Sequence, residues 1–292
     1  MKLIRKIFGI KSKEEKEQLH REWEKMKLEL KGKVSGLTQP AVKLSKSNSR
    51  TSSKLGGNPR VNDTSFSWPT HSGKPLIFLG QFDLAEIAKK HKYDWLAKSG
   101  SILFFYDFEA WGFDPEDRGK WKVIYQELPK VEVSFPDGFK NEFVVEESFL
   151  TPSKIEVLPY YDDPSIEKLG LTDEETDLYI EIKEHFEEFD AHGDLPCHQV
   201  GGFPDPIQGN DMQFEAEKAS KGIYMGDGKE YENAKQNDYL LAKEKWELLF
   251  QIDSDDDLGL FWGDLGMIYF WVEKEKSKVN NFTDSWLVLQ CT

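Results

Sequence analysis

The apolar positions of residues 14–31 repeat with the spacing of an α-helix. Steps of four, three and four residues separate the large apolar side chains, while Lys and Glu fill most positions between them; the apolar set is Leu19, Trp23, Met26 and Leu30. Because a helix turns once every 3.6 residues, this spacing places them on one face. The pattern predicts an amphipathic helix.

A change in composition follows this helix. Residues 45–53 are small and polar and show no periodicity, as in a linker or a loop lying on a folded body. We therefore expect two parts, a basic helical arm over residues 1–45 and a domain over residues 46–292.

Short apolar segments recur in the same order in both halves of this domain. The matched pairs are 76–83 with 246–253, 100–105 with 266–271, and 121–124 with 286–289, at offsets of 170, 166 and 165. A Gly-Gly-x-Pro motif also opens each half, at 56–59 and 201–204. Ordered repetition of this kind predicts an internal duplication, with halves at about 54–150 and 199–292.

The matched segments are rich in aromatic and β-branched residues, which favours antiparallel strands around a shared core. Strands are also expected at 130–135 and 143–145. A capping box at Thr172–Glu175 predicts a helix that continues through Leu178, Ile182, Phe186 and Phe189. The polar insertion at about 208–243 is rich in Lys, Glu and Ala and is expected to be helical. The predicted fold class is α+β, with duplicated, mainly antiparallel sheet units and a few packed helices.

The N-terminal part of the chain and the remainder carry charges of opposite sign. Residues 1–60 carry 16 Lys/Arg against 6 Asp/Glu, whereas residues 61–292 carry 22 against 47, a net charge of −25. Because an acidic surface repels phosphate, we expect no nucleic acid partner for the body and a basic protein instead.

Two observations bear on the compartment. The chain has only two cysteines, and it has no apolar run approaching the ~20 residues of a membrane span. We therefore expect a cytoplasmic protein. Residues 1–11 mix apolar and basic side chains, so the arm can either touch an anionic membrane weakly or dock on the acidic body.

A family resemblance rests on an ordered set of motifs, namely 53–59, Trp68-Pro69, 73–76, 78–82, 201–209, 249–253 and 262–266. This set resembles the bacterial YwqG-like family over roughly residues 35–292. The resemblance implies a repeated α+β structure of unknown function and no established catalytic residues. The chain departs from the usual family pattern at Gly80, where Ala is more common, and in its longer basic arm.

The loop after residues 246–253, the second copy of the first matched segment, carries the motif most suggestive of a functional site. Its alternating carboxylates can converge on a hard cation such as Ca²⁺; the candidate ligands are Asp253, Asp255, Asp257 and Asp264. The spacing departs from an EF-hand, because Leu258 stands where that loop needs glycine. A solvated acidic loop is the competing interpretation.

A candidate groove for a ligand or partner comes from the repeated positions. Trp111 and Trp262 each precede a glycine in an expected loop, and Gln81 and Gln251 end equivalent strands. Aromatic side chains dominate binding hot spots, so these four residues are the predicted groove. A second cluster at Asp190, His192, Asp194, Cys197 and His198 matches no zinc pattern and favours a hydrogen-bonded loop.

No P-loop, dinucleotide fingerprint or nucleophile elbow occurs, so the sequence favours a non-enzymatic role. The leading hypothesis is a protein-binding module of the immunity or antitoxin kind that masks a basic partner. The alternative is a metal-dependent enzyme or metal-regulated binder using the Asp253–Asp264 loop. A third possibility is a plain scaffold whose function resides in the arm.

Overall fold

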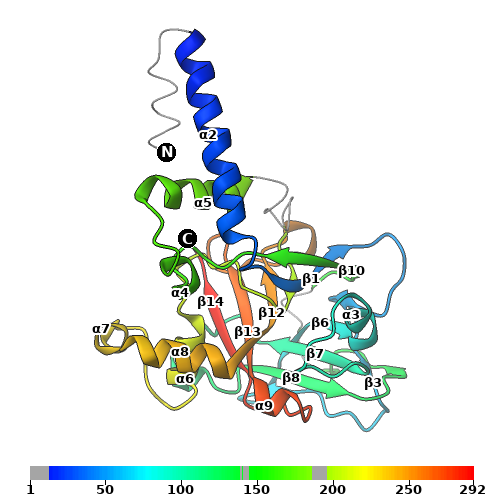
Figure 1. Ribbon diagram of the computed structural model, residues 1–292. Coiled ribbons are helices and arrows are strands. Elements are labelled where there is room, and N and C mark those ends of the chain that lie inside the picture. The colour runs from blue at the N-terminus through cyan, green and yellow to red at the C-terminus, as the bar shows by residue number, and fades with distance from the viewer. Residues whose placement is uncertain (1–12, 139, 141–144, 186–195) are drawn as a thin grey trace.

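A ten-stranded sheet forms the centre of the protein in the computed structural model, which describes residues 13–138, 140, 145–185 and 196–292 (Figure 1). In spatial order its strands are β14 (Trp286–Gln290), β13 (Met267–Glu273), β12 (Trp246–Asp253), β11 (Gln199–Val200), β1 (Gln39–Lys46), β10 (Ser148–Val157), β2 (Lys54–Leu55), β6 (Ile77–Asp83), β7 (Ser101–Tyr106) and β8 (Trp121–Gln126). All paired neighbours run antiparallel. Two small ladders join β3 (Arg60–Val61) to β9 (Val131–Glu132) and β4 (Thr70–His71) to β5 (Lys74–Pro75).

The order of the strands is similar on both sides of the central β1–β10 pair. From the centre outwards, β2, β6, β7 and β8 lie on one side, and β11, β12, β13 and β14 lie on the other. The register shifts at Leu79 in β6 and at Leu249 in β12, where a β-bulge interrupts the pairing with the next strand. Strand β1, which comprises residues 39–46, lies in the middle of this strand order.

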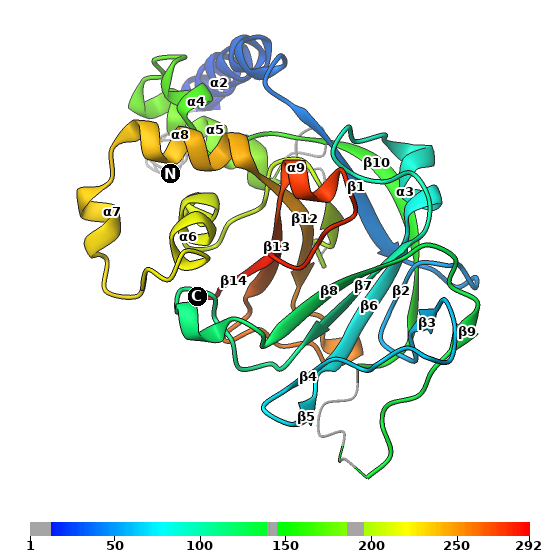
Figure 2. The same cartoon turned by 90° about the horizontal axis from the view of Figure 1, so that it is seen from below.

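The two sides of the sheet face each other across one core (Figure 2). The ring of Phe82 packs edge-on against that of Phe250, with centroids 4.2 Å apart, and Phe104 lies 5.0 Å from Phe270. Because side chains alternate along a strand, the outer face must be covered as well, and the outer residues Phe78, Leu103 and Phe105 form a separate cluster with Phe66 and Trp68. Every residue of β7 is consequently buried.

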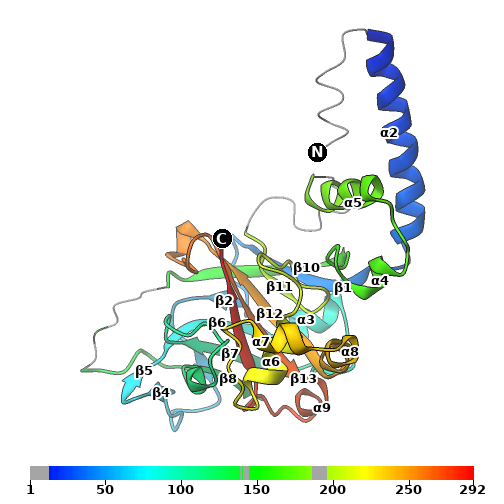
Figure 3. The same cartoon turned by 90° about the vertical axis from the view of Figure 1, so that its left-hand side faces the viewer.

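Helices cover the sheet and extend from it. They are α2 (Lys13–Val34), α3 (Leu84–Lys90), α4 (Pro164–Glu167), α5 (Asp173–His185), α6 (Met212–Ala219), α7 (Lys229–Asn233), α8 (Gln236–Lys245) and α9 (Lys274–Ser277). Helix α2 extends away from the sheet, and its C-terminal end packs on α5 through Leu30 and Val34 (Figure 3). None of the helices in the described part of the chain has the length and apolar composition needed to cross a membrane.

The mixed, mainly antiparallel fold and the helical arm agree with the sequence prediction. The expected helix at 14–31 is α2, and the expected capping box is present, since the Thr172 amide donates to Glu175 and the Glu175 amide donates to Thr172. The insertion is helical as α6, α7 and α8. Phe186, Phe189 and residues 143–144 lie outside the described residues, as do residues 1–12 of the arm.

Two strand predictions need correction. Only Val131–Glu132 is extended and paired within the expected strand at 130–135, because its single partner strand, β3, is two residues long. Val145 forms no strand pairing and instead accepts a hydrogen bond from Gly57 through its carbonyl oxygen.

Candidate functional site

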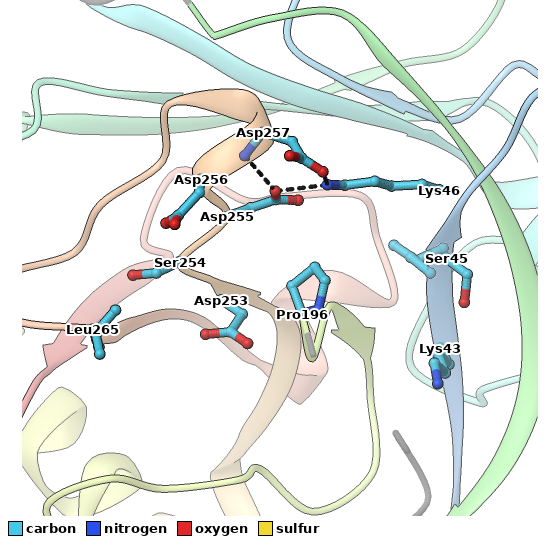
Figure 4. A pocket seen from close by; sticks show the side chains of 11 residues that line it. Lys43, Ser45, Lys46, Pro196, Asp253, Ser254, Asp255, Asp256, Asp257 and Leu265 are labelled. Atoms are coloured by element: carbon cyan, nitrogen blue, oxygen red, sulfur yellow. Dashed lines mark hydrogen bonds and ion pairs between the residues drawn. The ribbon is translucent and has the colours of Figure 1, made fainter. Parts of the chain in front are cut away.

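The acidic loop after β12 forms one wall of a pocket of about 710 Å³ (Figure 4). Strand β1 supplies the opposite wall through Lys43 and Lys46, and Asp253, Asp255 and Asp257 line the loop side. Strand β12 ends at Asp253, and residues 256–258 form a short 3₁₀ turn. Asp255 precedes this turn and Asp257 lies within it, and both carboxylates reach Lys46 of β1.

Lys46 joins two of the predicted metal ligands. Its ammonium lies 2.7 Å from Asp255 Oδ1 and 2.8 Å from Asp257 Oδ2 (Figure 4). Burial opposes the charge on Lys46, but the hydrogen bonds to both carboxylates outweigh it and raise the lysine pKa. The pocket thus contains a cation of the chain itself, the Lys46 ammonium, beside carboxylates for which the sequence predicts a bound metal ion.

Asp255 also faces a buried histidine. The backbone N–H of Asp253 donates to His198 Nδ1 over 3.2 Å, so Nδ1 is the unprotonated nitrogen and Nε2 carries the proton. His198 Nε2 lies 3.6 Å from Asp255 Oδ2, and both residues are buried. Burial alone would raise the pKa of Asp255, but its contacts with His198 and Lys46 hold it below the usual value.

The other two predicted ligands have different roles. Asp253 Oδ2 accepts a hydrogen bond from the Cys197 amide over 2.9 Å, and burial raises the pKa of Asp253. Asp264 accepts hydrogen bonds from Thr292 through its backbone oxygen. Among the described residues, no group of three or more His, Cys, Asp or Glu side chains is arranged to hold a metal ion. Asp190, His192 and Asp194 lie outside the described residues.

The two glutamines of the predicted groove are buried and bind backbone. Gln81 Oε1 accepts from the Arg60 amide and Gln251 Oε1 accepts from the Asp205 amide, each over 2.8 Å. Each therefore fixes the segment that follows a Gly-Gly turn, in which all four glycines have positive φ. Neither glutamine lines a described pocket.

The two tryptophans of the groove lie in neighbouring loops with opposite exposure. Trp262 is buried against Phe108, with ring centroids 5.3 Å apart, whereas Trp111 is 39% exposed. The Trp111 loop docks on β14, because the Leu289 amide donates to the Trp111 carbonyl over 2.9 Å and Trp286 Nε1 donates to the Gly112 carbonyl over 2.7 Å. A Cβ at Gly112 would overlap the carbonyl oxygen of Leu287, so this docking requires glycine.

Trp111 lines a second pocket of about 530 Å³ that the sequence does not predict. Its other lining residues are Phe113, Gln208, Gly209, Asp211, Met212, Glu215, Tyr231, Leu289 and Gln290. The Gln290 carboxamide organises one wall, since Oε1 accepts from the amides of Ile207 and Gln208 while Nε2 donates to the Gly209 carbonyl. We call this pocket the Trp111 cleft.

Two carboxyl groups one helical turn apart give the Trp111 cleft its chemistry. Burial raises the pKa of Glu215 to about 7, although a hydrogen bond from the Tyr231 hydroxyl over 2.8 Å partly opposes this. Burial also raises the pKa of Asp211. The spacing Asp211-x-x-x-Glu215 is visible in the sequence, but the approach of β14 and the Trp111 loop to this helix is not.

Most of the chain matches the model of one protein family. Residues 53–291 match the family model described as a domain of unknown function (DUF1963), and the chain belongs to that family. A search of curated proteins finds no match.

Proposed function

We propose that this chain is a protein-binding module for a basic partner, which it masks as immunity and antitoxin proteins mask theirs. The observation that carries the proposal is a set of exposed large apolar side chains on three adjoining loops of an acidic body. We call these three loops the loop face and name it by its exposed side chains Trp111, Tyr224, Phe261 and Leu265, of which Leu265 also lines the acidic pocket.

Direct contacts join the three loops. The Phe113 ring lies 5.8 Å from that of Tyr224, and the Met225 amide donates to the Phe113 carbonyl over 2.9 Å. Phe108, which lies in the same loop as Trp111, packs on Trp262, and Trp262 anchors the loop that carries Phe261 and Leu265. The loop that carries Trp111 therefore lies between the other two.

The exposure of these side chains is large for apolar residues: 39% for Trp111, 46% for Tyr224, 55% for Phe261 and 67% for Leu265. Exposed aromatic and aliphatic groups gathered in one region mark interaction surfaces, and aromatic residues supply much of the binding energy there. The net charge of −25 over residues 61–292 supports a basic partner, which it would attract before contact.

We further propose that the body arose by internal duplication and is YwqG-like, with halves at 54–150 and 199–292 and a cytoplasmic location. The arm expected at 1–45 would end before β1, because residues 39–46 pair within the sheet. The similar strand order on both sides of the sheet, the bulges at Leu79 and Leu249, and the matching roles of Gln81 and Gln251 support the duplication.

A second candidate function is metal-regulated binding, or metal-dependent catalysis, at the Asp253–Asp264 loop with a cation such as Ca²⁺. It is favoured by the convergence of Asp255 and Asp257 on one cation, the ammonium of Lys46. A divalent ion would have to displace that ammonium.

The test of the main proposal uses three baits in extracts of the source cell at low salt: the natural chain, the double variant Trp111→Ala/Phe261→Ala, and Val279→Ala. Val279 is 73% exposed and follows the far end of β13, so it is a matched control. We expect the natural chain and Val279→Ala to retain the same basic protein, and the double variant to lose it. Recovery of the same proteins by all three baits, or of none by the natural chain, would refute the proposal.

A further inference from the structure

The Trp111 cleft combines apolar walls with acidic groups. Met212 and Leu289 line it and are buried, at 1% and 8% exposure, while Trp111 lines it and keeps 39% of its surface exposed. Asp211 and Glu215 are four residues apart at the start of α6, so they share one helix face. A ligand entering this space meets hydrocarbon, an indole ring and two carboxyl groups.

The carboxylate of Asp211 is not used by the helix that it begins. Asp211 is the N-cap of α6, yet its side chain makes no capping hydrogen bond. Aspartate is a favoured N-cap residue because its carboxylate normally accepts from the first free amides of a helix. Asp211 is instead an exposed residue that lines the cleft.

The residues that line the cleft, all within the described chain, include no lysine or arginine. The cation that acts on Asp211 from outside is Lys243, but its ammonium is paired with Asp163 Oδ2 at 2.8 Å. Glu215 receives a hydrogen bond from the neutral Tyr231 hydroxyl. Two carboxyl groups therefore share a partly apolar space with no cation among its lining residues, an arrangement complementary to a positively charged ligand.

We propose that the Trp111 cleft receives a lysine side chain of the partner, with the ammonium between Asp211 and Glu215 and the alkyl stem against Met212 and Leu289. A cleft of about 530 Å³ is within the usual range for ligand pockets and holds such a side chain with room for water. The indole of Trp111 adds a cation–π surface. This inference rests on the proposed function and names the group of the partner that the cleft recognises.

Lysine fits this cleft better than arginine on geometric grounds. An ammonium is a compact charge with three rotatable donors, which can serve two carboxylates on successive helical turns at once. A guanidinium is a planar fork that suits one carboxylate in a bidentate pair. Because the two carboxyl groups here come from different residues, the compact cation is the better match.

The experiment titrates short peptides into the full chain and follows the indole N–H signals by NMR. The probes are acetyl-Gly-Lys-Gly-amide, the same peptide with Nε-acetyllysine, and the same peptide with arginine. The Trp111 signal is assigned from its loss in Trp111→Phe. We expect the lysine peptide to shift it saturably, and the acetylated peptide to leave it unchanged.

Variants connect the signal to the carboxylates. Asp211→Asn/Glu215→Gln should weaken lysine binding by at least about tenfold, which corresponds to about 1.4 kcal/mol. Glu232→Gln, which removes a charge from the nearby exposed helix α7, should leave it unchanged. Binding of the acetylated peptide, equal or tighter binding of the arginine peptide, or full binding by the double variant would each overturn the lysine assignment.

The two proposals fail separately. If the bait experiment retains a basic protein through the loop face and the peptides do not bind, the lysine pocket alone is wrong. If the lysine peptide binds through Asp211 and Glu215 while no protein is retained, the cleft recognises a small ammonium ligand and the protein-binding proposal is wrong.

Discussion

The indole of Trp121 packs edge-on against the indole of Trp286, with ring centroids 5.0 Å apart, although β8 and β14 are the two outermost strands of the sheet. Trp121 Nε1 also donates to the Ser285 carbonyl over 3.0 Å. The two edges of the sheet therefore meet, and this closure places the Trp111 loop of the first half on β14 of the second. Both the loop face and the Trp111 cleft depend on it.

Trp286→Ala should lower the free energy of unfolding by about 3–5 kcal/mol, because the side chain is fully buried at the closure and its removal leaves a cavity. Urea denaturation measures this change. Trp111→Ala is the control, since its ring is partly exposed, and it should cost less than about 1.5 kcal/mol. Equal losses from the two variants would contradict the closure as a source of stability.

Replacing Gln251 by methionine should cost about 1–3 kcal/mol, because the Asp205 amide and the Cys197 carbonyl lose their partners. Gln81→Met should cost a comparable amount through the Arg60 amide. Denaturant unfolding of both variants tests the equivalence that supports the duplication. A negligible loss at one position beside a large loss at the other would argue against it.

Glu215 makes stability depend on pH. Its folded pKa of about 7 lies above the ordinary value of 4.5, so the folded state holds a proton that the unfolded state has lost. Stability should therefore fall as pH rises from about 4.5 to about 7, by roughly 1–3 kcal/mol. Urea denaturation at pH 5 and at pH 7.5 measures this difference.

The fall should be smaller in Glu215→Gln, because glutamine does not titrate at this position, and unchanged in the exposed control Glu232→Gln. An unchanged fall in Glu215→Gln would assign the pH dependence to another group.

Lys46→Met should turn the acidic pocket into a site that responds to divalent cations. Without the ammonium, Asp255 and Asp257 repel each other, and Ca²⁺ would then stabilise the folded state that binds it. Thermal unfolding should show a larger Ca²⁺-induced rise for this variant than for the natural chain. The rise should vanish when Asp255→Asn/Asp257→Asn is added.

Identical Ca²⁺ shifts with and without Lys46 would mean that the lysine does not occupy the position of a cation. A large shift in the natural chain, abolished by Asp255→Asn/Asp257→Asn, would instead favour the metal-regulated function.

The sequence predicts the elements of this fold well, because strand and helix patterns are local. The stripe at Leu30 and the capping box at Thr172 each lie within one element, so periodicity and capping chemistry identify them. The roles of Gln81 and Gln251 are non-local, since each binds an amide 21 or 46 residues away. Their recurrence marks them as important without showing that their function is to hold loops.

The same limit applies to the candidate sites. The carboxylates at Asp255 and Asp257 suggest a cation in the sequence, but the lysine that neutralises them comes from β1, more than 200 residues away. The Trp111 cleft needs a loop of the first half, a helix of the insertion and the last strand. No short window of the sequence contains these parts, so pattern analysis identifies Trp111 and misses Asp211 and Glu215.

The most direct test of the central claim maps where a basic partner binds. Amide hydrogen exchange is measured for the full chain alone and for the full chain mixed with basic proteins of its source cell, which are collected by their retention on a cation-exchange column. Both samples are measured at low and at high salt. We predict protection at residues 108–113, 222–225 and 259–265 that disappears at high salt. Protection elsewhere, with these three loops exchanging as in the free chain, would contradict the claim.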